Sequence, residues 1–246
     1  AHLAELSAYP DPQYQRLRTA LGLFHRIDPD WILPGNGAAE LLTWACRDLA
    51  AQEITYLFTP AFSDYARALK AFNARFAGWA LEPQKHGWEI SQSYRQQRDK
   101  NLDSARSVGF LLNNPHNPTG RLFDRSLVVA LLDDQALVVV DEAFMDFLPP
   151  SEHQSVIDWV KDAPNLVVIR SLTKFYSLPG LRLGYAIAHP DRLKRWQQWR
   201  DPWSVNALAA AVGEVVVQDA DFQHQTWNWL ATAKPQLYQG LAEIPG

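Results

Sequence analysis

"FDRSLVVALLDDQALVVVD", residues 123–141, joins a helical pattern to a short apolar run that ends at a carboxylate. Residues 123–135 mix apolar and charged side chains as an amphipathic helix does, whereas the strand-like run 136–141 is apolar until Asp141. A strand that is apolar on both faces needs helices on both faces, which is typical of a parallel sheet. This helix–strand pair therefore predicts an α/β fold.

The same alternation extends in both directions from this stretch. Further strand-like runs are EITYLF (53–58), RFAGWAL (75–81), SVGFLL (107–112), NLVVIR (165–170) and GYAIA (184–188). Helical patterns at 37–50 and 61–73 separate several of them, and the chain from about residue 191 onward is almost entirely helical in pattern. We expect Pro235 to kink or divide the last helix. The pattern predicts a three-layer α/β/α sandwich with a mainly parallel central sheet.

Composition excludes several classes of protein. The 246 residues are 47% hydrophobic and 20% charged, which is typical of a globular chain, and the net charge of -4 argues against nucleic-acid binding. The single cysteine, Cys46, excludes an internal disulfide and favours a cytoplasmic location, with Cys46 expected in the core. No apolar run reaches the roughly 20 residues that span a membrane, and the first residues lack the layout of a signal peptide.

Four segments with reactive or polar side chains follow predicted strands or precede a predicted helix. They are GNGAAE (35–40), NNPHNPTG (113–120), DEAF (141–144) and SLTK (171–174). Ligands of parallel sheets collect beyond the carboxyl ends of the strands, so we expect these segments to meet.

Two of these segments offer main-chain or amide donors. The N–H groups of Gly37 and Ala38 could bind an anion at the start of a helix, although an ordinary helix entry has the same pattern. Asn114 and Asn117 could donate amide hydrogen bonds, or they could form a plain structural turn. Asn117–Pro118 is a candidate cis bond.

The other two segments offer charged groups. Asp141 ends an apolar strand, so it must find a cationic or hydrogen-bonding partner or cap a helix. Ser171, Thr173 and Arg182 suit a phosphate, and Lys174 suits a Schiff base. Surface pairing is the alternative for the lysine and the arginine taken separately.

Together, GNGAAE, NNPHNPTG, DEAF and SLTKFYSLPGLRLGY resemble the fold-type I, aspartate-aminotransferase-like family that depends on pyridoxal 5'-phosphate. The resemblance implies that Lys174 forms the Schiff base with the cofactor aldehyde. It also implies that Asp141 pairs with the pyridine nitrogen and that Asn117 contacts the phenolic oxygen. Both Lys174 and Asp141 would then be catalytic, and the resemblance implies no metal.

The resemblance also assigns the cofactor phosphate, the ring and the oligomer. Backbone amides of Gly37 and Ala38, together with Ser171 and Arg182, would hold the phosphate. The resemblance further implies an aromatic side chain stacked on the pyridine ring and a homodimer in which a tyrosine reaches the neighbouring subunit's site. The two residues in those positions are Phe62 and Tyr9.

The chain departs from the family pattern in two ways. Phe144 stands where many relatives carry a tyrosine that donates to the phenolic oxygen. We also expect the N-terminal arm and the C-terminal small domain to be missing. In that case residues 1–218 form the cofactor-binding large domain, and residues 219–246 form an interdomain helix that leads to the absent domain.

Within the family, PWSVNALAAAVGEVVVQD (202–219) and DEAFMDFLP (141–149) are most similar to threonine-phosphate decarboxylases of cobalamin biosynthesis. This implies a lyase that acts on a small phosphorylated amino acid and forms aminopropanol phosphate. One alternative is a histidinol-phosphate or related aminotransferase, and a second is a non-catalytic cofactor-binding fragment. Arg16, Arg18 and His116 are candidate ligands of the substrate phosphate, with solvated surface charge as the alternative.

Overall fold

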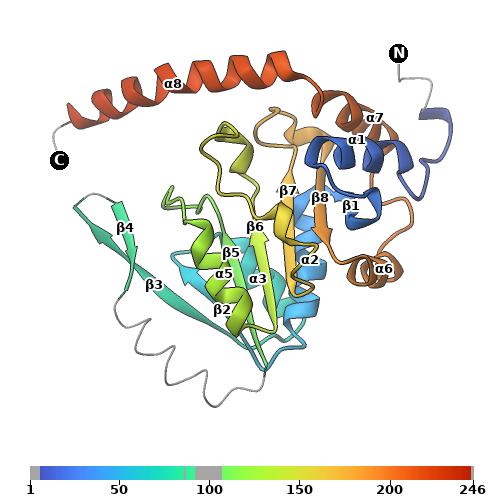
Figure 1. Cartoon of the computed structure of the whole chain (residues 1–246), viewed down its shortest axis with the longest axis horizontal. Helices are drawn as coiled ribbons and strands as arrows, with labels where there is room; N and C mark the ends of the chain where they lie inside the picture. Colours follow the sequence, from blue (N-terminus) through green and yellow to red (C-terminus); the bar gives the residue numbers. More distant parts are fainter. Residues whose placement is uncertain (1–5, 86, 92–106, 245–246) are drawn as a thin grey trace.

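The structure is a computed structural model that describes residues 6–85, 87–91 and 107–244. In these ranges eight strands form one sheet in the order β1-β8-β7-β6-β5-β2-β3-β4 (Figure 1). The strands are β1 (Ile32–Asn36), β2 (Ile54–Thr59), β3 (Phe76–Gln84), β4 (Gly87–Ile90), β5 (Val108–Asn113), β6 (Leu137–Asp141), β7 (Leu166–Ser171) and β8 (Leu183–Ala188). All six strands expected from the sequence are present, and β1 and β4 are additional.

The centre of the sheet is parallel, as the apolar runs predict. Strands β3, β2, β5, β6 and β7 pair in parallel, whereas β8 is antiparallel to both β7 and β1, and β4 is antiparallel to β3. Strand β1 contains Pro34 and Gly35, which are uncommon inside strands and hide it from a pattern search. It lies at the edge of the sheet, where a proline is tolerated.

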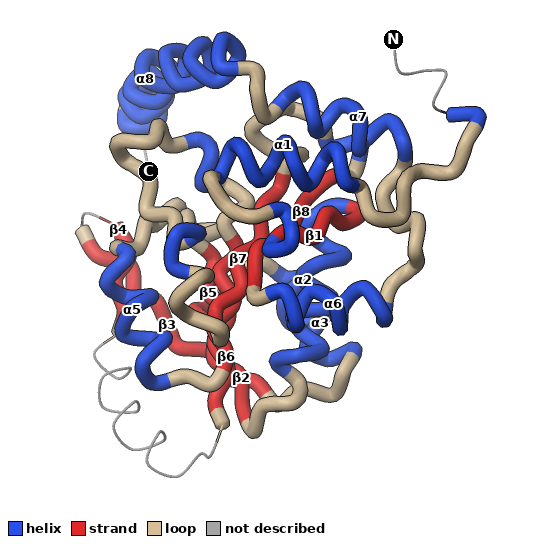
Figure 2. The backbone as a smooth tube through the Cα atoms, turned by 45° about the vertical axis from the view of Figure 1, so that its right-hand side comes forward, coloured by secondary structure: helices blue, strands red, loops and turns tan. Residues whose placement is uncertain are grey.

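Helices cover both faces of the sheet. The α-helices are α1 (Gln15–His25), α2 (Gly37–Leu49), α3 (Ser63–Ala71), α5 (Arg125–Asp134), α6 (Pro190–Trp199), α7 (Ala207–Val216) and α8 (Ala220–Ala242). The short 3-10 helices are η2 (Pro29–Trp31), η3 (Met145–Phe147), η4 (Ile157–Trp159) and η5 (Pro179–Leu181). Figure 2 shows α2, α3 and α6 on one side of the strands and α5 on the other.

The apolar side chains form one core on each face, which confirms the three-layer sandwich. Leu41 and Leu49 of α2 pack with Val139 and Val167 of the strands on one face. On the other face, side chains from α1, α5 and α7 pack against Val138, Val140 and Val168. Alternate positions of β6 and β7 therefore enter opposite cores. Cys46 lies in the first core as expected, and burial raises the pKa of its thiol to about 12.

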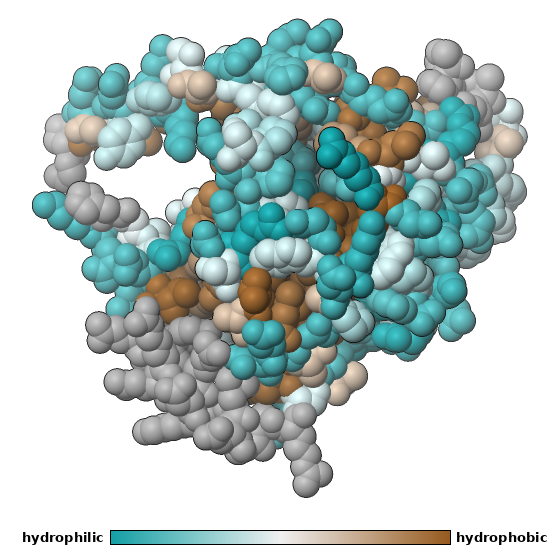
Figure 3. All heavy atoms as spheres, viewed as in Figure 1, coloured by the Kyte–Doolittle hydropathy of each residue, from teal (hydrophilic) through white to brown (hydrophobic). Residues whose placement is uncertain are grey.

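We expected Pro235 to kink or divide the last helix, and the helix is not divided there. Helix α8 runs from Ala220 to Ala242 with Pro235 inside it. Residues around Pro235 are exposed, so the carbonyl of Ala231 that loses its donor faces water, which lowers the cost of the proline. Figure 3 shows the C-terminal half of α8 standing away from the body of the molecule. None of the described helices is both long enough and apolar enough to cross a membrane.

Candidate functional site

The carboxyl ends of β1, β5, β6 and β7 meet at one edge of the sheet, because β1 and these parallel strands run in the same direction. A cavity of roughly 430 Å³ opens at this edge, large enough for a cofactor. Helices α2 and α3 supply its other wall. Eight of the candidate residues named from the sequence line it: Ala38, Phe62, Asn117, Asp141, Ser171, Thr173, Lys174 and Arg182.

The start of α2 forms a cradle beneath Arg182. Gly37 has φ +75°, and a Cβ built there would lie 2.7 Å from Nη2 of Arg182. Gly184 packs closely against the start of α2, since a Cβ built at Gly184 would lie 2.5 Å from the backbone nitrogen of Ala38. No side chain caps the N-terminus of α2, so its first N–H groups remain available to an anion. The ordinary helix entry considered from the sequence would not require this close approach.

Hydroxyl groups lie between the cradle and the lysine. Ser171 Oγ and Thr173 Oγ1 are 2.7 Å apart and both residues are buried. The ammonium of Lys174 donates to Thr173 Oγ1 at 3.3 Å, and Lys174 itself is exposed. The side chain of Lys174 thus rises from a buried strand end into the open part of the cavity.

The carboxylate of Asp141 accepts a hydrogen bond from Tyr65, which is distant in sequence. The hydroxyl of Tyr65 donates to Oδ2 of Asp141 at 2.7 Å, and the N–H of Ala143 donates to Oδ1 at 3.0 Å. Burial raises the pKa of Asp141, while the bonds from Tyr65 and Ala143 and the charge of Lys174 act in the opposite direction. The bond from Ala143 closes a local turn, because the two residues are only two positions apart. No α-helix begins after Asp141, so Asp141 is not an α-helix cap.

Of the two asparagines considered as ligand donors, Asn117 lines the cavity and Asn114 does not. Asn117 lines the cavity, its N–H donates to Asn113 Oδ1 at 2.6 Å, and the Asn117–Pro118 bond is cis as expected. Asn113 also donates to the carbonyl of Asp141 at 2.9 Å, which ties β5 to β6 at the cavity floor. For Asn114 the alternative given from the sequence, a structural turn, is the one observed. Its buried amide is bonded to both main-chain groups of Phe123 and closes the turn.

The two aromatic candidates lie far apart. Phe62 is 42% exposed at the cavity wall and meets Tyr65 edge-on, with ring centroids 5.5 Å apart. Tyr9 does not reach this cavity; it is 79% exposed, packs on Trp203 at 4.7 Å and lines a separate cavity of about 220 Å³. The role in a neighbouring subunit implied for Tyr9 stays a prediction.

The candidate substrate-phosphate ligands have structural partners instead. Arg18 is buried and donates to the carbonyls of Pro29 and Ile32, and Arg16 pairs with Glu214 at 2.8 Å. His116 is also buried, and burial lowers its pKa to about 4. Solvated surface charge therefore describes only Arg16, and none of the three lines the candidate site.

Tyr65 and Asn113 were not identified from the sequence, although both line the cavity. A signal for Tyr65 does exist, because it follows Phe62 by three residues at the start of α3. Side chains spaced by three residues lie on one face of a helix, so Tyr65 should accompany Phe62. For metal ions, the described residues contain no group of three or more His, Cys, Asp or Glu placed to bind one.

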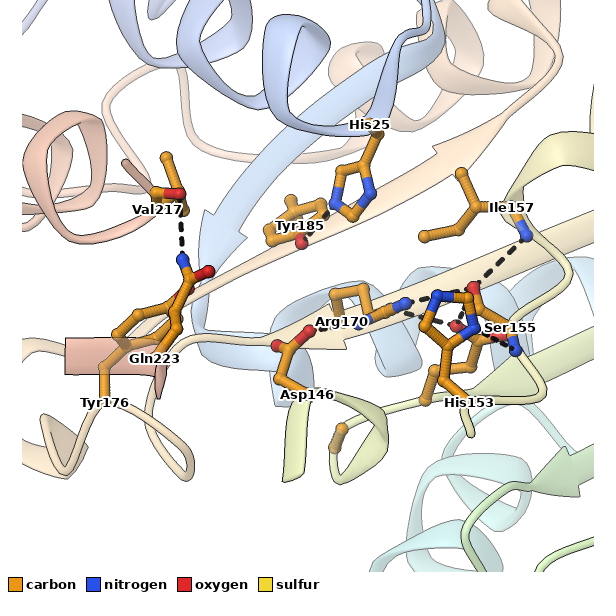
Figure 4. Close-up of polar contacts among 12 residues, drawn as sticks. His25, Asp146, His153, Ser155, Ile157, Arg170, Tyr176, Tyr185, Val217 and Gln223 are labelled. Carbon is orange, nitrogen blue, oxygen red and sulfur yellow. Dashed lines mark hydrogen bonds and ion pairs between the residues drawn. The ribbon is translucent and has the colours of Figure 1, made fainter. Parts of the chain in front are cut away.

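The same strand ends carry a second polar cluster on the opposite face, which we call the far face (Figure 4). Glu142 directly follows the cavity residue Asp141, and Arg170 directly precedes the cavity residue Ser171. Because side chains alternate along a strand, Glu142 and Arg170 point away from the cavity. Nε of Arg170 donates to Glu142 Oε2 at 2.9 Å, and Arg170 also pairs with Asp146. Although burial opposes its charge, these two carboxylates raise the pKa of Arg170.

The chain is similar to known proteins over almost its whole length. Residues 3–244 match the family model described as aminotransferase class I and II. The chain is 37% identical to threonine-phosphate decarboxylase of Salmonella typhimurium over 245 residues, which cover 98% of this chain and 65% of that protein. It is 32% identical to histidinol-phosphate aminotransferase 2 of Ralstonia nicotianae, covering 97% of this chain and 63% of the relative.

A solved structure agrees with these matches. Histidinol-phosphate aminotransferase of Sinorhizobium meliloti, in complex with pyridoxal-5'-phosphate, superposes with a TM-score of 0.83 at 20% identity. The match covers 96% of this chain and 63% of that one. The chain thus spans somewhat less than two thirds of the length of these relatives, and it shares their large α/β fold.

Proposed function

This chain belongs to the aminotransferase class I and II family, and we propose that its cavity binds pyridoxal 5'-phosphate and that the whole protein decarboxylates L-threonine O-3-phosphate. The observation that carries the cofactor assignment is the meeting of Lys174, Asp141 and the Gly37–Arg182 cradle around one cavity of roughly 430 Å³. A cation-lined cradle, a buried carboxylate and an accessible amine match the three parts of this cofactor. The residues present therefore fit it.

In this proposal different residues of the chain bind the aldehyde and the phosphate of the cofactor. When bound, pyridoxal phosphate supplies an aldehyde for a lysine amine and a ring that withdraws electrons from the substrate. Lys174 supplies the amine, and its single weak bond to Thr173 leaves it free to move a proton. Arg182, Ser171 and the first N–H groups of α2 bind the phosphate.

Three further residues hold the ring in this proposal. Asp141 accepts the N–H of the pyridinium, a role that its position at the cavity floor supports. Phe62 packs on one ring face, and Asn117 donates to the phenolic oxygen. Phe144 also lines the cavity, and its side chain has no donor for that oxygen, so Asn117 is the amide that serves it.

The choice of reaction rests on similarity. Identity to the decarboxylase is 37%, against 32% for the aminotransferase, and Phe144 in place of a tyrosine supports the same choice. A histidinol-phosphate or related aminotransferase is the second candidate, favoured by 32% identity over 97% of this chain and by the shared fold. A cofactor-binding fragment without activity is the third.

Two structural proposals accompany the reaction. We propose that residues 1–218 are the cofactor domain and that 219–246 form an interdomain helix, of which residues 245–246 lie outside the described ranges. The separation of the C-terminal half of α8 from the body of the molecule supports this division. We also propose a homodimer in which the exposed Tyr9 reaches the neighbouring cofactor site.

The test uses the full-length protein loaded with pyridoxal phosphate. We expect it to release labelled CO₂ from carboxyl-labelled threonine O-phosphate without any oxo acid, and to continue over many turnovers. A protein that instead forms glutamate from 2-oxoglutarate and histidinol phosphate is the aminotransferase. Lys174→Ala should lose either activity, whereas Lys194→Ala, which alters an exposed lysine on α6, should retain it.

A further inference from the structure

A buried hydrogen bond joins α3 to β6 directly behind the proposed ring site. The hydroxyl of Tyr65 and Oδ2 of Asp141 are 2.7 Å apart, although the two residues are 76 positions apart in sequence. Tyr65 is 2% exposed and Asp141 is 8% exposed. Both side chains line the cavity, so the bond lies between its wall and its floor.

The direction of this bond follows from the two groups. Burial and the nearby Asp141 raise the pKa of Tyr65 well above its usual value, so the phenol keeps its proton and must donate. Asp141 must then accept, which favours its ionised form. Its other oxygen accepts from Ala143 N–H, so each oxygen holds one protein donor and retains a lone pair for a ligand.

We propose that Tyr65 is a positioning residue of the cofactor site: its hydroxyl keeps the Asp141 carboxylate ionised and orients it to accept the ring N–H of pyridoxal phosphate. This inference rests on the proposed function, because it gives Tyr65 a role only through Asp141.

The other groups facing Asp141 cannot replace the tyrosine. Lys174 stabilises the carboxylate by its positive charge, but Lys174 is also the amine that reacts with the cofactor, so its charge changes during use. Asn113 binds the main-chain carbonyl of Asp141 and not its carboxylate. Ala143 is a fixed main-chain donor on the same turn. Tyr65 is the side-chain donor that remains constant when Lys174 reacts.

Tyr185 offers a matched control on the far face. Like Tyr65 it is buried, at 1% exposed, and burial raises its pKa well above the usual value. Its hydroxyl lies 2.7 Å from Nε2 of His25. It does not line the candidate cavity. Tyr65→Phe and Tyr185→Phe therefore each remove one buried hydroxyl with one bond of equal length, and only the first touches Asp141.

The first test titrates Asp141 in the cofactor-free chain by carboxyl ¹³C NMR, with the resonance assigned from Asp141→Asn. We expect Tyr65→Phe to raise the pKa of Asp141 and Tyr185→Phe to leave it unchanged. Should Tyr65→Phe fail to fold, 3-fluorotyrosine at position 65 keeps the shape and donates more strongly, so it should lower the pKa of Asp141. An unchanged titration in the folded variant would overturn the proposal.

The second test compares pyridoxal phosphate with its 1-deaza analogue, which lacks the ring nitrogen. The wild-type protein should bind the natural cofactor more tightly, and Tyr65→Phe should reduce that preference about tenfold, the effect of one hydrogen bond to a charged group. Tyr185→Phe should keep the full preference. Equal losses for both ligands in Tyr65→Phe would show a structural role only and would overturn the inference.

The two proposals fail in different ways. If the wild-type protein binds neither ligand, the proposed function is wrong and Tyr65 has no cofactor to serve. If the wild-type protein binds pyridoxal phosphate and Tyr65→Phe keeps the full preference, only the role of Tyr65 is wrong.

Discussion

The two faces of β6 and β7 use neighbouring residues in opposite ways. On the far face, Arg170 is bonded to Glu142, to Asp146 and to Ser155 Oγ at 3.0 Å, so its charge is well matched. On the cavity face, Lys174 has one hydroxyl contact at 3.3 Å and Arg182 one carbonyl contact at 3.2 Å within the described residues. The cations on the two faces thus differ in the number of their partners, although Arg170 on the far face directly precedes Ser171 on the cavity face.

This difference separates stability from binding. Charges that are paired within the protein hold the loop 142–158 against β7 and have little capacity left for a ligand. Charges with few protein partners cost stability, but they keep hydrogen-bonding capacity that a ligand can use. The cavity face is thus suited to bind, and the far face is suited to hold the strand ends in place.

The largest expected effect is on the cavity face. Lys174→Ala should abolish covalent attachment of pyridoxal phosphate, because among the described residues no other lysine lines the cavity. Borohydride reduction followed by peptide mass spectrometry should find the pyridoxyl group on Lys174 in the wild type and nowhere in the variant. Labelling at another lysine would contradict the assignment.

The next effect should be a loss of stability on the far face. Arg170→Met leaves the carboxylate of Glu142 buried without its cation, which typically costs about 3–5 kcal/mol. For a chain of this size we expect the melting temperature to fall by about 10 °C. Arg16→Met, which breaks a pair between an exposed arginine and the half-buried Glu214, should have a much smaller effect. Equal effects from the two variants would contradict the contrast between the faces.

Neighbouring carboxylates should then respond with opposite signs. Since burial raises the pKa of Asp141, the folded chain binds this proton more tightly than the unfolded chain, and stability falls as pH rises above 3.8. Asp141→Asn removes this loss, so at neutral pH it should stabilise the cofactor-free protein by about 0.5–2 kcal/mol. Burial raises the pKa of Glu142 as well, but Glu142→Gln should destabilise the protein, because the buried guanidinium of Arg170 then loses a carboxylate partner. Denaturant unfolding measures both, and a shared sign would sink the distinction.

The smallest effect concerns protons on the far face. Burial and the charge of Arg170 lower the pKa of His25 well below 6.5, so the unfolded chain binds this proton first and stability falls as pH drops below 6.5. His25→Gln should reduce the slope of unfolding free energy against pH there, by up to about 1.4 kcal/mol per pH unit. His224→Gln on the exposed side of α8 serves as the control. An unchanged slope in His25→Gln would place the acid sensitivity elsewhere.

Much of the fold could be predicted because its signals are local. An apolar run such as 136–140 excludes a half-exposed strand, and alternation with helices then favours a parallel sheet. The exceptions have local causes too. Strand β1 was missed because Pro34 and Gly35 interrupt its pattern, and Pro235 did not divide α8 because that helix is exposed.

Less of the site could be predicted, because it depends on distant contacts. The segments that carry Lys174, Asp141 and Arg182 were recognisable, and the structure brings them to one cavity. Asn114 and His116 carry the same kinds of side chain as ligand residues, yet both are bonded within their own loop. Nothing in the local pattern separates them from Asn117.

By itself the sequence determined six of the eight described strands, the helices between several of them and the residue types at the strand ends, because these depend on side chains close together in the chain. Only the tertiary structure decided that Asp141 faces the cavity with Tyr65 as its partner, while Glu142 faces Arg170 on the other side. The physical reason is that a buried carboxylate must take its partners from whichever elements pack against it. For Asp141 that partner lies 76 residues away on α3.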